Sequence, residues 1–148
     1  MIEVCVDANL AVMWYTPEDL RDKSVALLKE CDRLDIRLIA PDHMMAEAAS
    51  VIRTKLYRGL IDADEAWIAV SLLVQTQIDY VDVLELVPDA WRIAENYNLA
   101  SLYDAYYLAL AEGRGCDFWT ADERFINSVR GVPFVRHIKD FTAESMQG

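Results

Sequence analysis

The feature that most constrains this chain is a repeated switch between short apolar runs and longer segments with helical spacing of apolar residues. Short apolar runs bounded by turn residues are typical of buried strands, and strands that alternate with helices favour a parallel sheet. The predicted strands are residues 2–6, 37–40, 81–84, 117–120 and 134–138. The pattern therefore predicts an α/β fold of three layers, in which helices cover both faces of a central, mostly parallel sheet of about five strands.

Turn and capping residues place the predicted helices between these strands. A brief apolar helix follows Asn9, and Pro17 suits the first position of a second helix, where a proline gives up no helical hydrogen bond. A long helix is predicted after Pro41 and stops at Gly59. The later helices are predicted at residues 62–76, 88–97, 101–112 and 122–129.

Length and composition indicate one domain, residues 1–148, because 54% hydrophobic residues supply enough apolar surface for a substantial core. The sequence shows no secretory signal and no apolar run near the roughly 18 residues that a membrane span needs, so we expect a soluble protein of the cytoplasm. Residues 12–14 and 67–73 carry aromatic and aliphatic side chains that suit an interface, but we expect them in the core.

The supply of metal ligands argues against zinc. The three cysteines form no Cys-x-x-Cys pair, and the two histidines, His43 and His137, lie far apart in the sequence. Any metal would therefore be held by oxygen. The net charge of −11 argues against broad adhesion to nucleic acid or to an anionic membrane, and it favours a basic protein partner. A nucleic-acid substrate stays compatible with this charge if a metal ion and a local cluster of cations hold the phosphates.

Four acidic residues lie where a parallel α/β sheet gathers its chemistry, at the carboxyl ends of strands or on the helices that follow. They are Asp7, Glu47, Asp104 and Asp122. Each has a structural alternative: an Asx-turn for Asp7, a solvated position for Glu47, a capping box with Ser101 for Asp104, and a helix N-cap for Asp122.

Taken together, the four carboxylates favour a metal site. Carboxylates that converge in a partly dry pocket repel one another and raise their own pKa values unless a cation neutralises them. Mg²⁺ or Mn²⁺ takes such oxygen ligands, and carboxylate-held Mg²⁺ is typical of phosphodiester hydrolysis. A metal would also explain why Asp104 has no Lys or Arg one helical turn away.

The segments around these acids resemble a known family. Residues 6–9 (VDAN), 44–53 (MMAEAASVIR), 103–112 (YDAYYLALAE) and 119–122 (WTAD) are similar to PIN-domain ribonucleases, and most of all to the bacterial and archaeal VapC-like toxins. The likeness runs from residue 2 to about residue 141, and the stretch from Asp104 to Asp122 is its most specific part. It implies a PIN-like fold and a Mg²⁺- or Mn²⁺-dependent endoribonuclease that serves as the toxin of a toxin–antitoxin pair.

The resemblance also implies roles for individual residues and partners. Asp7, Glu47, Asp104 and Asp122 would bind the metal and position the hydrolytic water, and Asn9 and Thr120 would support them by hydrogen bonding. The implied partners are the RNA substrate, a small antitoxin with a basic or amphipathic segment, and a second copy in a homodimer or higher even oligomer. Candidate RNA or phosphate contacts are Arg53, Lys55, Arg58 and Arg124, for which ordinary solvated charges are the alternative.

Other classes fit less well. A haloacid-dehalogenase-type phosphatase needs a second acid where this chain has Asn9, and a response-regulator receiver needs paired acids after its first strand. The alternative that stays open is a catalytically inactive PIN-like module that binds RNA or protein. A desolvated cluster of acids costs stability, so the presence of all four favours the nuclease.

Overall fold

The computed structural model describes residues 2–146. Its centre is a five-stranded sheet of order β3-β2-β1-β4-β5, in which every pair of neighbouring strands is parallel. The strands are β1 (Glu3–Val6), β2 (Arg37–Pro41), β3 (Asp79–Val81), β4 (Asp117–Thr120) and β5 (Val135–His137). The prediction of an α/β fold with about five mostly parallel strands is confirmed.

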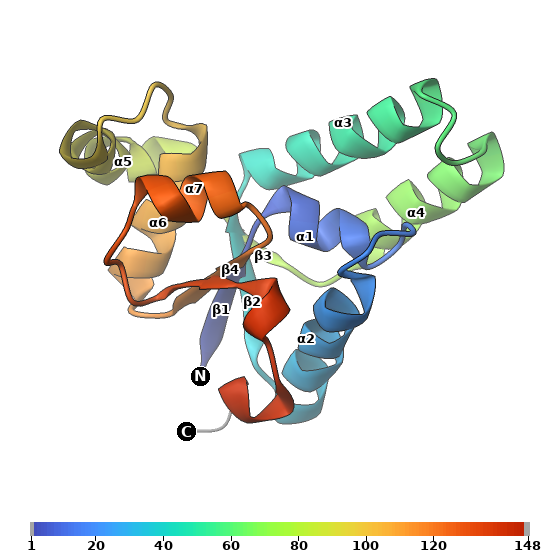
Figure 1. Cartoon of the computed structure of the whole chain (residues 1–148), viewed down its shortest axis with the longest axis horizontal. Coiled ribbons are helices and arrows are strands. Elements are labelled where there is room, and N and C mark those ends of the chain that lie inside the picture. The colour runs from blue at the N-terminus through green and yellow to red at the C-terminus, as the bar shows by residue number, and fades with distance from the viewer. Residues whose placement is uncertain (1, 147–148) are drawn as a thin grey trace.

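Helices connect all the strands and lie on both sides of the sheet (Figure 1). They are α1 (Ala8–Met13), α2 (Arg21–Leu34), α3 (His43–Tyr57), α4 (Ala63–Gln75), α5 (Val83–Tyr97), α6 (Tyr103–Arg114) and α7 (Glu123–Ser128), with short 3₁₀ turns at Ile138–Asp140 and Ala143–Met146. The α3 and α4 helices form an arm that extends to one side of the sheet, and α5 packs on α6 at the other side (Figure 1). None of the helices within residues 2–146 is long and apolar enough to cross a membrane.

The order of the strands sets the position of the site. The chain moves from β1 to β2 and β3 in one direction, and then returns across the sheet to place β4 on the free side of β1. The carboxyl ends of β1 and β4 are therefore the topological switch point of the sheet. In open parallel sheets this is where loops diverge and functional side chains gather.

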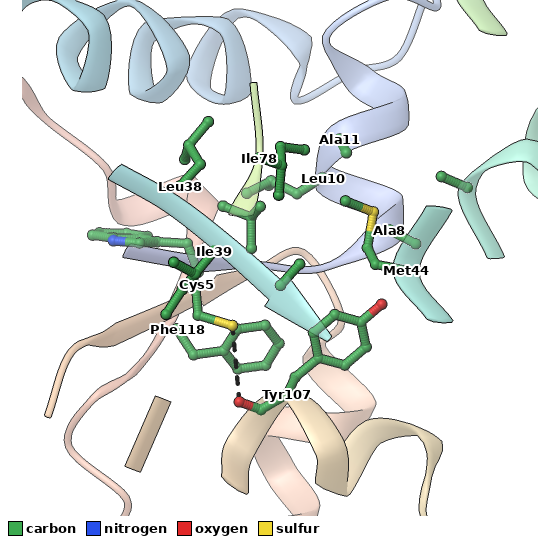
Figure 2. Close-up of a cluster of buried hydrophobic side chains, with 14 of the residues drawn as sticks. Cys5, Ala8, Leu10, Ala11, Leu38, Ile39, Met44, Ile78, Tyr107 and Phe118 are labelled. Carbon is green, nitrogen blue, oxygen red and sulfur yellow. Dashed lines mark hydrogen bonds between the residues drawn. The ribbon is translucent and has the colours of Figure 1, made fainter. Parts of the chain in front are cut away.

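One hydrophobic core lies around β1 and β4. Cys5, Phe118 and Trp119 have almost no solvent exposure, and Tyr107 of α6 stacks on Phe118 with 5.4 Å between ring centroids. Figure 2 shows the ring of Tyr107 within this cluster, with its hydroxyl on the side that faces Met44 of α3. The core thus contributes one polar atom to the carboxyl edge of the sheet.

Three predicted boundaries are wrong. The third strand ends at Val81, because the Asp82 side chain accepts a hydrogen bond from the Leu84 amide and starts α5 at Val83. Pro88, predicted at the start of this helix, lies inside it. The second helix begins at Arg21 instead of Pro17, because the chain first continues the hydrogen bonding of α1: the Thr16 hydroxyl donates to the carbonyl of Val12.

The predicted burial of the two apolar segments is half right. Residues 12–14 are buried in the core, as expected. On α4, however, only the face with Ala66, Ala69 and Leu73 is buried, and Trp67, Ile68 and Leu72 are exposed. The α4 helix packs against α3 and α1, so its outer face has no cover within the described part of the chain.

Candidate functional site

The first acid, Asp7, lies at the switch point between β1 and α1. It is the N-cap of α1: its Oδ1 accepts a hydrogen bond from the Leu10 amide at 2.9 Å. Its Oδ2 accepts a hydrogen bond from the Thr120 hydroxyl. With 9% exposure the carboxylate is buried. Asp7 is therefore held by two donors, neither of which carries a positive charge.

Thr120 ends β4 and connects Asp7 to Asp122. Its hydroxyl oxygen donates to Asp7 and accepts a hydrogen bond from the Asp122 amide at 3.0 Å. Asp122 is the N-cap of α7, where its Oδ1 accepts from the Phe125 amide at 3.0 Å. The capping role considered for Asp122 is thus observed, and it engages one of the two carboxylate oxygens.

Asp104 lies in the first turn of α6, on the exposed side of the site. The capping box with Ser101, the structural alternative for this acid, does not form, because the Ser101 hydroxyl accepts a hydrogen bond from the Tyr103 amide and the helix begins at Tyr103. Across residues 2–146, no hydrogen bond or ion pair to the Asp104 carboxylate is formed. A capping function therefore does not account for this acid.

Glu47 reaches the site from α3. Its Oε1 accepts a hydrogen bond from the Tyr107 hydroxyl at 3.2 Å and lies 2.7 Å from Nε2 of His43. Neither Tyr107 nor His43 is among the predicted site residues. Helical spacing could have indicated both residues as neighbours of the predicted acids. His43 precedes Glu47 by four residues, and Tyr107 follows Asp104 by three, so each pair shares a helix face.

The acids influence one another. Burial, and then the charges of Asp122 and Asp104, raise the pKa of Asp7 from 3.8 to about 6, against the lowering effect of its hydrogen bonds. The pKa of Asp104 is also raised, first by loss of hydration and then by Asp122 and Glu47, while His43 lowers it. Burial raises the pKa of Tyr107, with Glu47 as the next cause, so its hydroxyl stays a donor.

This donor set fits a hard divalent cation that keeps part of its water shell. The donors are carboxylate oxygens that repel one another, which is the chemistry that Mg²⁺ and Mn²⁺ select. In the part of the chain that the structure describes, no group of three or more His, Cys, Asp or Glu side chains is close enough to cage a metal ion. One or two direct carboxylate ligands with bound water are usual for Mg²⁺. The carboxylate donors therefore suit this ion even though no three of them form a cage.

Of the two residues predicted to support the acids, Thr120 contacts one of them and Asn9 does not. Thr120 makes the hydrogen bonds described above, whereas Asn9 is exposed on α1 and its side chain makes no hydrogen bond within residues 2–146. Lys55 forms an ion pair with Glu18, and is thus engaged away from the acids.

The three arginines predicted to contact RNA are exposed. Arg124 follows Asp122 by two residues, Arg53 lies about 9 Å along the α3 axis from Glu47, and Arg58 about 16 Å. Of these, Arg124 is nearest to the acids along the chain, and Arg58 marks the far end of α3.

The acidic site combines the buried Asp7 with the exposed Asp104. A cavity of about 790 Å³ lies elsewhere, at the amino edge of the sheet, where it is lined by the ends of α2 and α4 and by Arg37 and Asp79. The cavity is therefore separate from the four acids, which follow β1 and β4 or lie at the starts of α3 and α6.

A parallel sheet with carboxylates at its switch point defines an α/β domain with an acidic site suited to divalent cations. The chain belongs to the PIN domain family, whose sequence model matches residues 4–130. PIN domains are generally nucleases, bind nucleic acid and usually use divalent metals.

Comparison with solved structures supports the fold. The crystal structure of PAE2754 from Pyrobaculum aerophilum superimposes with a TM-score of 0.62 at 20% sequence identity, over 93% of this chain and 92% of that chain. No curated protein matches the chain.

Proposed function

We propose that this protein is a Mg²⁺- or Mn²⁺-dependent endoribonuclease and the toxin of a toxin–antitoxin pair. The observation that carries the proposal is electrostatic: the charges of Asp122 and Asp104 raise the pKa of Asp7, and those of Asp122 and Glu47 raise the pKa of Asp104. No Lys or Arg is paired to any of these acids among the described residues. Membership of the PIN domain family supports nuclease activity in general.

In this mechanism the chain's own residues bind and orient the reactants. Asp7, Asp104 and Asp122 would hold the ion, one or two of them directly and the others through its bound water, and Glu47 would bind it directly or through water. Bound Mg²⁺ or Mn²⁺ supplies Lewis-acid stabilisation of the phosphate charge and lowers the pKa of the attacking water. The carboxylates would orient the attacking water for in-line attack on phosphorus. The bond to the 3′-oxygen breaks, which leaves a 5′-phosphate and a 3′-hydroxyl.

The RNA contacts in the proposal come from the exposed residues near the acids. Arg124 and Arg53 are the candidate phosphate contacts, while the ion pair of Lys55 and the distance of Arg58 make these two weaker candidates. Tyr103, 64% exposed and directly before Asp104, adds a surface on which an unpaired base can stack.

The proposed partners follow from charge and exposed apolar surface. A net charge of −11 favours an antitoxin with a basic segment. The exposed outer face of α4, with Trp67, Ile68 and Leu72, offers apolar surface to the antitoxin or to a second copy in a homodimer. In this proposal the chain acts as one PIN-like domain in the cytoplasm.

The test is cleavage of a mixed panel of structured and single-stranded RNAs with Mg²⁺, Mn²⁺ or EDTA. We expect cleavage that requires the metal and leaves 5′-phosphate ends. Asp104→Asn should lower the rate at least about 100-fold, because it removes a proposed ligand. Asp79→Asn, a carboxylate at the amino edge of the sheet, is the matched control and should retain the activity.

The opposite result separates the two classes of function. If wild type and Asp104→Asn are equally inert, and no metal raises the melting temperature of the wild type, the nuclease proposal fails. A PIN-like module that binds RNA or protein without cutting would then be the better description, and RNA binding in EDTA would be the next measurement.

A further inference from the structure

Two side chains outside the set of four acids converge on a single oxygen of Glu47. His43 approaches from the same helix, with its Nε2 2.7 Å from Oε1, and Tyr107 approaches from α6, with its hydroxyl 3.2 Å from the same atom. Since α6 also carries Asp104, these contacts tie the position of Glu47 to the helix of another acid.

The His43 ring is held on several sides. Its Nε2 lies 3.2 Å from the carbonyl oxygen of Tyr103, and a carbonyl only accepts, so Nε2 carries the hydrogen. The rings of Tyr103, Tyr106 and Tyr107 surround it, with centroid distances of 5.9, 5.3 and 5.1 Å. Packed in this way, His43 directs its Nε2–H toward both the Tyr103 carbonyl and Glu47.

Tyr107 is at least as firmly placed. The side chain is 2% exposed, and its ring is stacked on Phe118 with an interplanar angle of 12°. Its hydroxyl is the part of the ring that faces α3, as Figure 2 shows on the side of Met44. The hydroxyl is therefore a donor fixed by the core of the protein.

We propose that His43 and Tyr107 are positioning residues that hold Oε1 of Glu47 and so present its second oxygen to the cation. A free glutamate side chain loses rotamer freedom when it binds a ligand, and a side chain that is already held loses less. Partners of this kind orient metal ligands in many proteins, and their loss commonly weakens metal binding 10- to 100-fold. The inference rests on the proposed function only in that Glu47 serves a bound cation.

The experiment measures Mn²⁺ binding by calorimetry without RNA. Tyr107→Phe keeps the stacked ring and removes only the hydroxyl, and we expect Mn²⁺ to bind roughly 10-fold more weakly. His43→Gln should act in the same direction. Tyr15→Phe is the matched control, because it removes a tyrosine hydroxyl bonded to Thr76, away from the acids, and should leave Mn²⁺ binding unchanged.

A double-mutant cycle with Glu47→Gln separates positioning from a general structural effect. If Tyr107 acts through Glu47, Tyr107→Phe should weaken Mn²⁺ binding in the wild type and change it less than twofold in the Glu47→Gln background. Equal effects in the two backgrounds, wild-type affinity in Tyr107→Phe, or no Mn²⁺ binding by the wild type would each overturn the proposal. Mn²⁺ binding with the expected cycle but no RNA cleavage would support the positioning role and reject the nuclease.

Discussion

The two edges of the sheet carry similar acidic residues in different electrostatic surroundings. At the amino edge, Glu3 lies 3.4 Å from Arg37 and 2.6 Å from Arg114, and Arg37 is also 3.0 Å from Asp79. At the carboxyl edge, Asp7 has only neutral donors. Among the four acids there, the sole contact with a basic side chain within residues 2–146 is that of Glu47 with the imidazole of His43.

This difference separates carboxylates that arginines of the chain neutralise from carboxylates that have no such partner among the described residues. Arginines at the amino edge neutralise acids at the starts of β1 and β3, so these acids are part of the scaffold. At the carboxyl edge the charges repel one another, and the pKa values of Asp7 and Asp104 are raised. Uncompensated charge at one edge of an otherwise well-paired sheet is the condition under which the proposed cation would lower the repulsion.

The largest effect that we expect at the carboxyl edge is a change of stability with pH. The pKa of Asp7 in the fold is about 6 against an ordinary 3.8, so its charge opposes folding above pH 6, and this penalty disappears as the pH falls toward 3.8. Two pKa units correspond to about 3 kcal/mol. Asp104 acts in the same direction.

Urea unfolding of the wild type and Asp7→Asn in EDTA, from pH 7.5 to 4.5, measures this effect. Asparagine still caps α1 through its amide oxygen, so the variant should be the more stable protein at neutral pH. The difference should shrink as the pH falls. If the difference in the free energy of unfolding between the two proteins stays constant over this range, ionisation of Asp7 does not cause the pH dependence.

A divalent cation should relieve the same repulsion at neutral pH. Free Mn²⁺ at 100 times its dissociation constant should raise the free energy of unfolding by about 2.7 kcal/mol. Thermal melting against Mn²⁺ concentration measures the change. Asp104→Asn should lose most of it and Asp79→Asn should keep it. Equal Mn²⁺-induced shifts of the melting temperature in the two variants would mean that the ion binds away from Asp104. The carboxyl edge would then not differ from the amino edge in cation binding.

The smallest effect should come from the amino edge. Glu3→Gln removes the negative charge that pairs with two arginines, and we expect the free energy of unfolding to fall by about 1 kcal/mol. This loss of stability should be smaller at high salt, because salt screens the ion pairs that Glu3 forms with the partly exposed Arg37 and Arg114. Denaturant unfolding at two salt concentrations tests this. A gain in stability, as expected for Asp7→Asn, would mean that the amino-edge acids are also uncompensated.

Much of the fold could be predicted from local pattern. The runs at residues 117–120 and 37–40 correspond closely to β4 and β2, and Asp62 caps α4 where its helix was predicted to begin. The prediction failed at the third strand, because Val83 and Leu84 suit a strand and a buried helix equally. The capping hydrogen bond of Asp82 decides between them.

The candidate site was predictable in its residue types, and the structure supplies their connections. Asp7 and Asp122 could be recognised as candidates because each follows a predicted strand. Asp104 could be recognised because no Lys or Arg lies one helical turn away from it. The pairing of His43 with Glu47 was visible as a spacing of four residues, but the same spacing occurs on any solvated helix face. Only the packing of α6 against the sheet brings the Tyr107 hydroxyl to Glu47.

The sequence by itself determined the alternation of strands and helices, the surplus of negative charge and the four acids, because periodicity, composition and spacing are local properties. Tertiary structure alone decided which acids are compensated. The return of the chain to place β4 beside β1 brings Thr120 to Asp7, and the register of β1 with β2 sets Arg37 beside Glu3. Electrostatic energy depends on distance and burial, which become defined only when segments far apart in the chain meet.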